Sequence, residues 1–277
     1  MAGPVDGEHY REHGWLVFPD AFDNALLEGI TGELTTLCRG DRGPIRGGAP
    51  VAPEDSDAAV LSRHVALHFP HKCSPLVRTF VHHPWLVALF STLLGPDVKV
   101  VQSMYFIRPP GGPGQAWHQD ERFVPTRDRS LTGAWLALDD ATVDNGCLWV
   151  IPGSHRRGIV WPHRPHGSAD FDPVDAAHHP HAESEAVPLP VSRGTLIVFD
   201  GHLVHRSLPN RSDGFRRSLA LHAARATSRM PWMGAEQRGP IGEADCRDFE
   251  LISGEDPYAD EPRDDLLLPW LRPARLS

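Results

Sequence analysis

Cysteine is scarce in this chain of 277 residues. The four cysteines, Cys38, Cys73, Cys147 and Cys246, are scattered and form no CxxC pair. That spacing argues against a disulfide framework and against a cysteine zinc site. We therefore expect reduced thiols, as in a cytoplasmic protein.

Long apolar runs and an excess of positive charge are also missing. No stretch of about eighteen residues is continuously apolar, and the N-terminus lacks the basic and apolar segments of a signal peptide. The 27 basic and 36 acidic residues give a net charge of −9, which offers no electrostatic footprint for nucleic acid or an anionic membrane. These absences favour a small-molecule substrate and leave the oligomeric state open.

The pattern of apolar residues changes near residue 98. Residues 1–97 have mainly helical spacing, interrupted by an apolar strand at 15–18, and Asp23 is a plausible N-cap for the helix that follows it. Pro84 divides a later helical stretch in two. Residues 98–225 contain short β-rich runs separated by turn residues, which is typical of a sandwich or barrel.

The 40% hydrophobic content predicts one domain over 1–277, with an all-β core and flanking helices. Within the core, 161–186 is rich in His and Pro and is interpreted as an insertion, and 226–277 is expected to wrap the domain as loops and short helices. The DNG sequence at 144–146 predicts a hairpin, and 209–214 a second turn. The basic run from Arg63 to Lys72 is interpreted as a solvated face or a helix start.

One short pattern indicates a metal site. Iron that activates oxygen needs three protein ligands on one face and open positions opposite, and two histidines with one carboxylate supply this. In an extended segment residues i and i+2 point the same way, so His118-Gln119-Asp120 could supply two ligands, although a surface ion pair explains the same residues. His-x-Asp/Glu is expected about twice by chance in this composition. The other match, His181-Ala-Glu183, lies in a polar stretch that we interpret as a solvated loop.

A third ligand has to come from a distant strand. The segment 194–224 holds a strand, a turn and a returning strand, and His205 lies at the end of the first strand. His202 is the alternative, which we interpret as a histidine of a loop or one that lies behind the ligands. Ser207 shares a face with His205 and can donate a hydrogen bond to a carboxylate.

The returning strand begins with two arginines, either of which could bind a dicarboxylate cosubstrate such as 2-oxoglutarate. A guanidinium group is the best bidentate partner for a carboxylate. Strand alternation puts Arg216 on a small or polar face with Ser218 and His222, and Arg217 on a face with leucines. A polar face lines a site more readily, so the alternation favours Arg216.

Three segments make the pattern more specific: AWHQD, GAWLALDDATVDNGCLWVIPGSH and DGHLVHRSLPNRSDGFRRSLALH. Together they resemble the phytanoyl-CoA dioxygenase family of iron(II) and 2-oxoglutarate oxygenases, over roughly residues 98–222. The resemblance implies a double-stranded β-helix, or jelly-roll. It also implies that His118, Asp120 and His205 are iron ligands. Arg216 and Ser207 would bind the distal carboxylate of the cosubstrate. Gln102 and Trp135 would contact the cosubstrate or form the wall of its pocket. Gln102 can equally be a polar group of the core whose hydrogen bonds are satisfied, and Trp135 can equally be a packing residue.

The implied reaction consumes O2 and 2-oxoglutarate, releases succinate and CO2, and oxidises an unactivated carbon. Members that halogenate have a small residue in place of the carboxylate ligand. Asp120 is present here, which favours hydroxylation, while desaturation, epimerisation or cyclisation stay open.

The substrate is not predicted beyond a small molecule, such as a natural-product intermediate, an amino acid or an acyl thioester. Position near the proposed ligands suggests five pocket residues, which are Tyr105, Arg122, Phe123, Trp161 and Trp232. The alternative to an oxygenase is a cupin-like barrel that binds a metal without redox turnover. Retention of a carboxylate clamp favours the enzyme.

Overall fold

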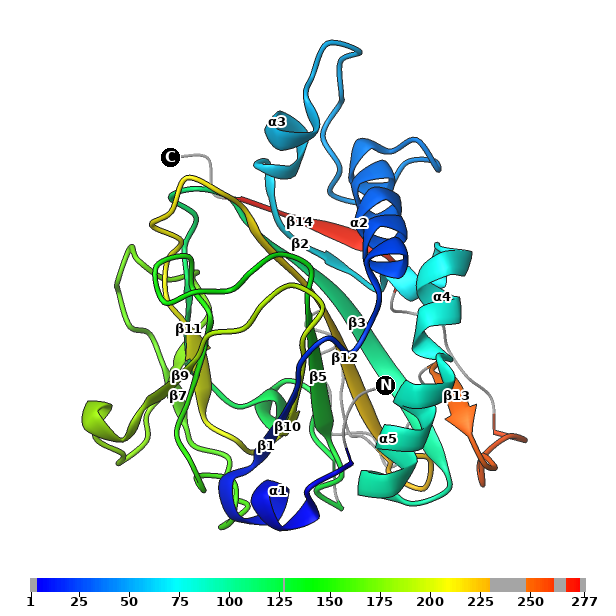
Figure 1. The fold of residues 1–277 in the computed structure, drawn as a ribbon, viewed down its shortest axis with the longest axis vertical. Coiled ribbons are helices and arrows are strands. Elements are labelled where there is room, and N and C mark those ends of the chain that lie inside the picture. The colour runs from blue at the N-terminus through cyan, green and yellow to red at the C-terminus, as the bar shows by residue number, and fades with distance from the viewer. Residues whose placement is uncertain (1–3, 127, 230–247, 262–267, 275–277) are drawn as a thin grey trace.

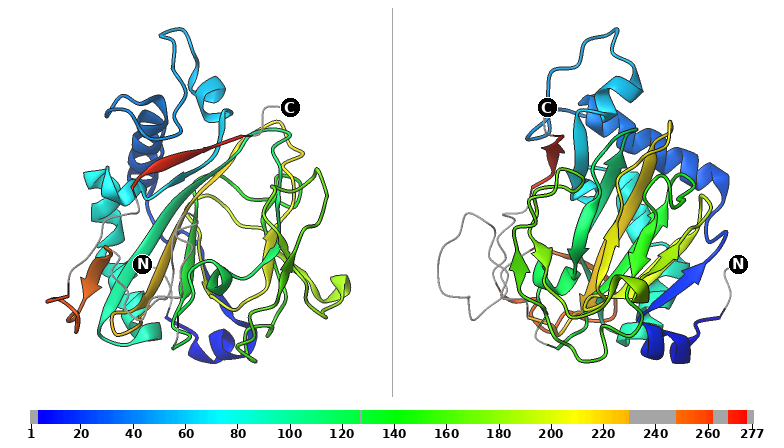
Figure 2. Two further views of the ribbon diagram at one scale, coloured as in Figure 1. Left: turned by 180° about the vertical axis from the view of Figure 1, so that it is seen from behind. Right: turned by 90° about the vertical axis from the view of Figure 1, so that its left-hand side faces the viewer.

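The computed structural model describes residues 4–126, 128–229, 248–261 and 268–274 (Figure 1). Two antiparallel sheets face each other, and helices cover the outer side of the larger sheet (Figures 1 and 2). Strands with buried residues on both faces suit this arrangement, because the large sheet packs against helices on one side and against the small sheet on the other. The predicted all-β core with flanking helices is confirmed, and its architecture is the jelly-roll.

The large sheet has eight strands. Its order is β1 (Trp15–Phe18), β10 (Leu196–Asp200), β5 (Thr132–Ala137), β12 (Arg216–Arg225), β3 (Val98–Arg108), β2 (His64–His68) and β14 (Trp270–Pro273), and β13 (Glu250–Ser253) also pairs with β3. The strand expected at 15–18 is therefore present, as an edge strand that pairs with β10.

The small sheet has four strands and carries part of the candidate site. Its order is β4 (Gln115–His118), β11 (His205–Ser207), β6 (Leu148–Val150) and β9 (Val187–Leu189). A two-stranded sheet, β7 (His163–Arg164) with β8 (Ala176–Ala177), and the 3-10 helix η3 (Glu183–Glu185) lie within 161–186.

The helices begin and end where the local sequence allows. In α2 (Asn24–Arg39) the Asp23 side chain accepts a hydrogen bond from the Leu26 N–H at 2.8 Å, as predicted, and Gly40 ends the helix with φ of 80°. Pro84 begins a new helix, so the stretch divides as expected. The remaining helical elements are α1 (Gly7–His13), α3 (Asp57–Leu61), η1 (Pro70–Lys72), α4 (Pro75–Val81), α5 (Pro84–Leu94) and η2 (Asp120–Arg122).

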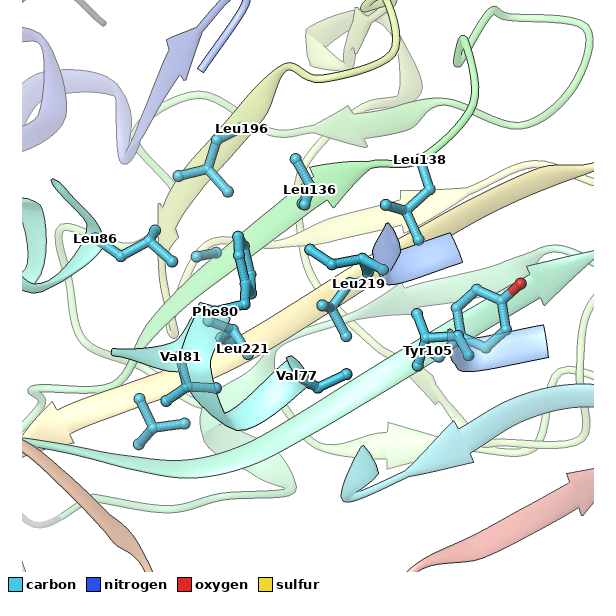
Figure 3. Close-up of a cluster of buried hydrophobic side chains, with 14 of the residues drawn as sticks. Val77, Phe80, Val81, Leu86, Tyr105, Leu136, Leu138, Leu196, Leu219 and Leu221 are labelled. Atoms are coloured by element: carbon cyan, nitrogen blue, oxygen red, sulfur yellow. The ribbon is translucent and has the colours of Figure 1, made fainter. Parts of the chain in front are cut away.

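The main apolar core lies between these helices and the outer face of the large sheet. Figure 3 shows side chains of α4 and α5 together with Tyr105, Leu136, Leu219 and Leu221 from the central strands. A second cluster, which includes Trp135, fills the space between the two sheets. No helix in the described ranges is both long enough and apolar enough to cross a bilayer.

Three sequence predictions about secondary structure are wrong. The run that begins at Arg63 is no solvated face, because His64–His68 form β2 with every residue buried. The DNG turn makes no hairpin, since it joins β5 of the large sheet to β6 of the small one. The chain after residue 225 adds the strands β13 and β14 to the large sheet, where loops and short helices were expected.

Candidate metal centre

Strand pairing brings two distant histidines together. His118 ends β4 and His205 begins β11, and the two residues are register partners in the small sheet. Their ring centroids lie 4.1 Å apart. Directly after β4 the chain turns into η2, whose first residue, Asp120, points back at the same place. One ligand atom from each of the three buried residues lies within 4.8 Å of the others.

In both histidines a hydrogen bond holds Nδ1 and leaves Nε2 available to a metal. The Nδ1 of His118 lies 2.8 Å from the Ala116 carbonyl oxygen, and the Nδ1 of His205 lies 2.9 Å from that of Leu203. A carbonyl only accepts, so each Nδ1 carries the proton and each Nε2 keeps a lone pair for a metal. The fixed tautomers show that these residues fit a metal ion.

The charge states also suit a cation. Burial, and then the neighbouring His205, lower the pKa of His118 to about 3, so protons do not compete for it at neutral pH. Burial by itself would raise the pKa of Asp120, but the surrounding histidines, His222 foremost, outweigh burial and lower it. The cluster therefore presents a carboxylate and a neutral imidazole to the centre.

Gln119, between the first two ligands, braces the site. Its side chain is fully buried and donates to the carbonyl oxygens of His202 and Ile159 at 2.6 and 2.9 Å, and it accepts from the Trp161 N–H at 2.9 Å. The amide thus ties β4 to the loop before His205 and to the start of 161–186. Composition gave no sign of this role. The signal available was its position between two ligands, which turns its side chain to the other face of the strand.

Arg216 lies at the start of β12, buried and without an acidic partner among the described residues. Its guanidinium contacts the Ser218 hydroxyl at 3.5 Å and lies 5.7 Å from the Trp135 ring, and its Nε has no hydrogen-bond partner. Burial and the nearby Arg108 lower its pKa to about 9, so it stays charged at neutral pH. A buried cation without a counter-ion is costly, so an external carboxylate fits here.

Arg217, the alternative, is already paired. It makes two side-chain contacts of 2.7 Å with the Asp139 carboxylate. Its register partner on β3 is Ile107, a residue of the helix-facing core. The structure therefore distinguishes the two arginines in the direction that strand alternation indicated.

Gly146 lies close both to the Arg216 guanidinium and to the main chain of Leu208, the residue after Ser207. A Cβ added to Gly146 would lie 3.8 Å from Arg216 Nη2 and 2.3 Å from the Leu208 carbonyl oxygen. The Ser207 hydroxyl is buried and accepts from the Gln115 N–H at 3.3 Å. The turn at Gly146 therefore lies between the Arg216 guanidinium and the main chain of Leu208. Ser207 directly precedes Leu208.

Gln102 and Trp135 both lie on the inner face of the large sheet. Gln102 is buried on β3, opposite His222 of β12, and Trp135 is buried between the sheets, opposite Ala220. His222 contacts the candidate centre directly, because its Nε2 lies 3.0 Å from Asp120 Oδ2. Sequence analysis placed His222 on the Arg216 face and gave it no role, although an inward polar residue in an apolar strand was a usable signal.

The four suggested pocket residues that the structure describes do not come together. Tyr105 belongs to the helix-facing core, because strand alternation turns it away from Gln102, and the Trp161 ring packs on Trp117, Ile151 and Val204, behind the small sheet. These two suggestions are corrected. Trp232 lies outside the described residues.

The other two suggested residues lie at the rim. Phe123 is 6.1 Å from the His118 ring by centroids and stacks on His163, to whose Nδ1 Arg122 donates at 3.1 Å. Glu183 of the rejected match accepts a hydrogen bond from the Trp117 indole, outside the metal cluster.

Fold and site together define a class: a jelly-roll protein with a buried centre of two histidines and one carboxylate. The model of one family, described as phytanoyl-CoA dioxygenase (PhyH), matches residues 10–218. The chain belongs to this family.

Relatives of known sequence or structure agree with this assignment. Phytanoyl-CoA dioxygenase 1 of Oryza sativa subsp. japonica is 38% identical over 174 residues, which cover 60% of this chain and 58% of the rice protein. The chain thus spans less than two thirds of that relative. The apo structure of the non-heme monooxygenase ThoJ is 26% identical with a TM-score of 0.67, covering 90% of this chain and 84% of ThoJ.

A second similar structure shows the fold with its ligands. The epimerase SnoN, in complex with Fe3+, alpha ketoglutarate and nogalamycin RO, is 21% identical with a TM-score of 0.63. The match covers 90% of this chain and 94% of SnoN. At this identity the likeness shows the shared fold alone.

Proposed function

We propose that the protein is an iron(II)- and 2-oxoglutarate-dependent oxygenase that hydroxylates an unactivated carbon of a small molecule. His118, Asp120 and His205 would hold the iron through the two Nε2 atoms and a carboxylate oxygen. The geometry that supports this is a three-residue cluster on one side of a centre, as oxygen-activating iron requires.

The observation that carries the proposal is the buried Arg216, which has no acidic partner in the part of the chain that the structure describes. A silent metal-binding barrel has no use for a buried guanidinium without a counter-ion, whereas a dicarboxylate cosubstrate supplies that counter-ion. Arg216 would bind the distal carboxylate of 2-oxoglutarate, and the Ser207 hydroxyl would donate a second hydrogen bond to it. Trp135, whose ring lies 5.7 Å from the guanidinium, would wall the same pocket.

When bound, iron(II) activates O2 and couples oxidative decarboxylation of 2-oxoglutarate, to succinate and CO2, to insertion of the second oxygen atom into a C–H bond. The chain's own part is positional. Arg216 orients the cosubstrate, Gln102 contacts it from β3, and the Nδ1 hydrogen bonds of His118 and His205 keep the ligand rings from rotating.

Hydroxylation is the outcome we propose, because the carboxylate ligand Asp120 is present and because ThoJ, at 26% identity, is described as a monooxygenase. SnoN is described as an epimerase on the same fold, so the fold does not decide the outcome. Phe123 and Arg122 at the rim are the residues that we propose to contact the substrate.

The test is an anaerobic titration of apo-protein with Fe(II) and 2-oxoglutarate, followed by the weak visible charge-transfer band of a chelated keto acid. Wild type should develop the band. Arg216→Ala should need about 10- to 100-fold more 2-oxoglutarate, the cost of one charged hydrogen-bonded partner.

Arg217→Ala is the matched control, since it removes a neighbouring arginine that is paired with Asp139 on the other face. It should bind 2-oxoglutarate as wild type does. No band in wild type would overturn the oxygenase and favour the barrel without redox turnover.

A further inference from the structure

The two oxygens of the Asp120 carboxylate face different partners. Oδ1 lies 3.7 Å from His118 Nε2 and 3.6 Å from His205 Nε2, so it faces the candidate metal position. Oδ2 lies 3.0 Å from His222 Nε2 and within hydrogen-bond distance of it. One oxygen is therefore presented to the centre and the other is held by an imidazole.

The direction of this hydrogen bond follows from its chemistry. An ionised carboxylate only accepts, so the Nε2 of His222 carries the proton and donates. The side chains of His222 and Asp120 are both buried, where a hydrogen bond to a charged group is stronger than in water. A carboxylate oxygen held in this way resists rotation toward a metal.

The sheet around His222 is closely packed. His222 lies on β12 between Gln102 of β3 and Gly133 of β5. At Gly133 the Phe199 ring occupies the space that a Cβ would need, with a carbon 2.6 Å from that position. The same Phe199 ring lies 4.7 Å from the His205 ring by centroids. His222 thus belongs to a packed wall that also contacts a candidate ligand.

We propose that His222 is a positioning residue that restricts Asp120 to binding the metal through one oxygen. The inference rests on the iron site of the proposed function and adds how that site keeps its open positions. A carboxylate that binds through both oxygens occupies one more position. Two histidines, a two-oxygen carboxylate and a chelating keto acid would then fill an octahedral ion and leave no position for O2.

The first measurement is the affinity of the apo-protein for Co(II) alone, followed by visible absorption. His222→Phe removes the donor at similar size and should weaken Co(II) binding by about 10- to 100-fold, as loss of a partner behind a metal ligand does. His222→Gln places an amide N–H near the former Nε2 and should restore most of the affinity.

The matched control is His68→Phe. His68 is a buried histidine on β2, which pairs with β3; it is stacked on Trp270 and lies near His222, but it makes no contact with the three ligands among the described residues. This variant should bind Co(II) as wild type does. Thermal unfolding checks each variant, and His222→Leu takes over as the donor-free variant if His222→Phe does not fold.

The second measurement counts open positions. Nitric oxide is added anaerobically to protein loaded with Fe(II) and 2-oxoglutarate, and the iron–nitrosyl EPR signal is recorded. Wild type and His222→Gln should give the signal. His222→Phe should keep the keto-acid band but lose most of the signal, because Asp120 then binds through both oxygens.

The outcomes separate the two proposals. Absence of Co(II) binding by wild type would overturn the iron site, and this inference with it. Wild-type affinity and a full nitrosyl signal in His222→Phe would overturn the role of His222 and leave the oxygenase standing. Equal losses in His222→Phe and His68→Phe would show a general packing effect, which also overturns it.

Discussion

The two faces of β3 and β12 carry different kinds of residues. On the outer face Tyr105, Ile107, Leu219 and Leu221 pack under the helices (Figure 3). On the inner face the alternate residues are mostly polar and buried, and these are Gln102, Arg108, Arg216, Ser218 and His222. The same two strands therefore supply an apolar core on one side and a charged site on the other.

This contrast shows how one strand can serve stability and chemistry independently. Outer residues stabilise by removing apolar area from water, at roughly 25 cal/mol per Å2. Inner residues such as Arg216 and His222 have buried atoms that find no hydrogen-bond partner among the described residues, and such atoms lower stability unless a ligand satisfies them. The inner face is thus built for a bound state, and substitutions on the two faces should affect different measurements.

The largest effect is expected from a pair of carboxylates. Asp120→Ala removes an inner ligand and should abolish measurable metal binding and succinate release, exceeding the loss of about 10- to 100-fold for a residue behind the ligands. Asp139→Ala removes the outer partner of Arg217 and should leave metal affinity unchanged, at a cost of about 1–3 kcal/mol in unfolding free energy. Calorimetric metal titration and urea unfolding measure the two effects. Equal metal affinity in Asp120→Ala and Asp139→Ala would contradict the assignment of metal binding to the inner face alone.

An outer leucine should show the reverse pattern. Leu219 is fully buried under the helices, so Leu219→Ala should lower the free energy of unfolding by about 2–5 kcal/mol. The folded variant should bind Co(II) with wild-type affinity. A lowered affinity at temperatures where the variant is folded would show that the faces are coupled.

The connection between the sheets offers a third test. Gly146 has φ of 91°, and a Cβ there would lie 2.3 Å from the Leu208 carbonyl oxygen. Gly146→Ala should therefore cost about 1–3 kcal/mol of stability. Because the same turn lies beside Arg216, the variant should also bind 2-oxoglutarate more weakly, with Co(II) affinity retained. Unchanged 2-oxoglutarate affinity would place the clamp elsewhere.

The smallest effect concerns pH. Burial, with Arg272 and His222 nearby, lowers the pKa of His68 to about 3. Below an unfolded pKa of about 6.5 the unfolded chain binds a proton that the folded chain does not, so stability falls as pH drops from about 6.5 toward 3. One such histidine contributes up to about 1.4 kcal/mol per pH unit. Urea unfolding of apo-protein at pH 7, 6 and 5 should show a shallower decline for His68→Phe, and parallel declines would contradict the assignment.

Alternation along a strand was the most productive sequence signal. It distinguished Arg216 from Arg217 and placed His222 on the inner face. Applied consistently, it would also have turned Tyr105 away from Gln102, because the two residues are three positions apart. The error arose because Tyr105 was chosen for its position near the proposed ligands in the sequence, without asking which face of the strand its side chain occupies.

Other features could not be read locally. The DNG turn specifies a tight reversal, but which sheet receives the next strand depends on packing across the molecule. The strand β2 carries two histidines, and their burial depends on the strands β3 and β14 that pair with it. The short strands β13 and β14 have four residues each, too few to show a period in a Pro-rich sequence.

The most direct test of the central claim is a crystal structure of the protein with Mn(II) and 2-oxoglutarate, grown without oxygen, with the metal located by anomalous scattering. The account predicts Mn(II) at His118 Nε2, Asp120 Oδ1 and His205 Nε2, with the distal carboxylate of 2-oxoglutarate on Arg216. Mn(II) bound elsewhere, or 2-oxoglutarate that leaves Arg216 without a partner, would contradict it.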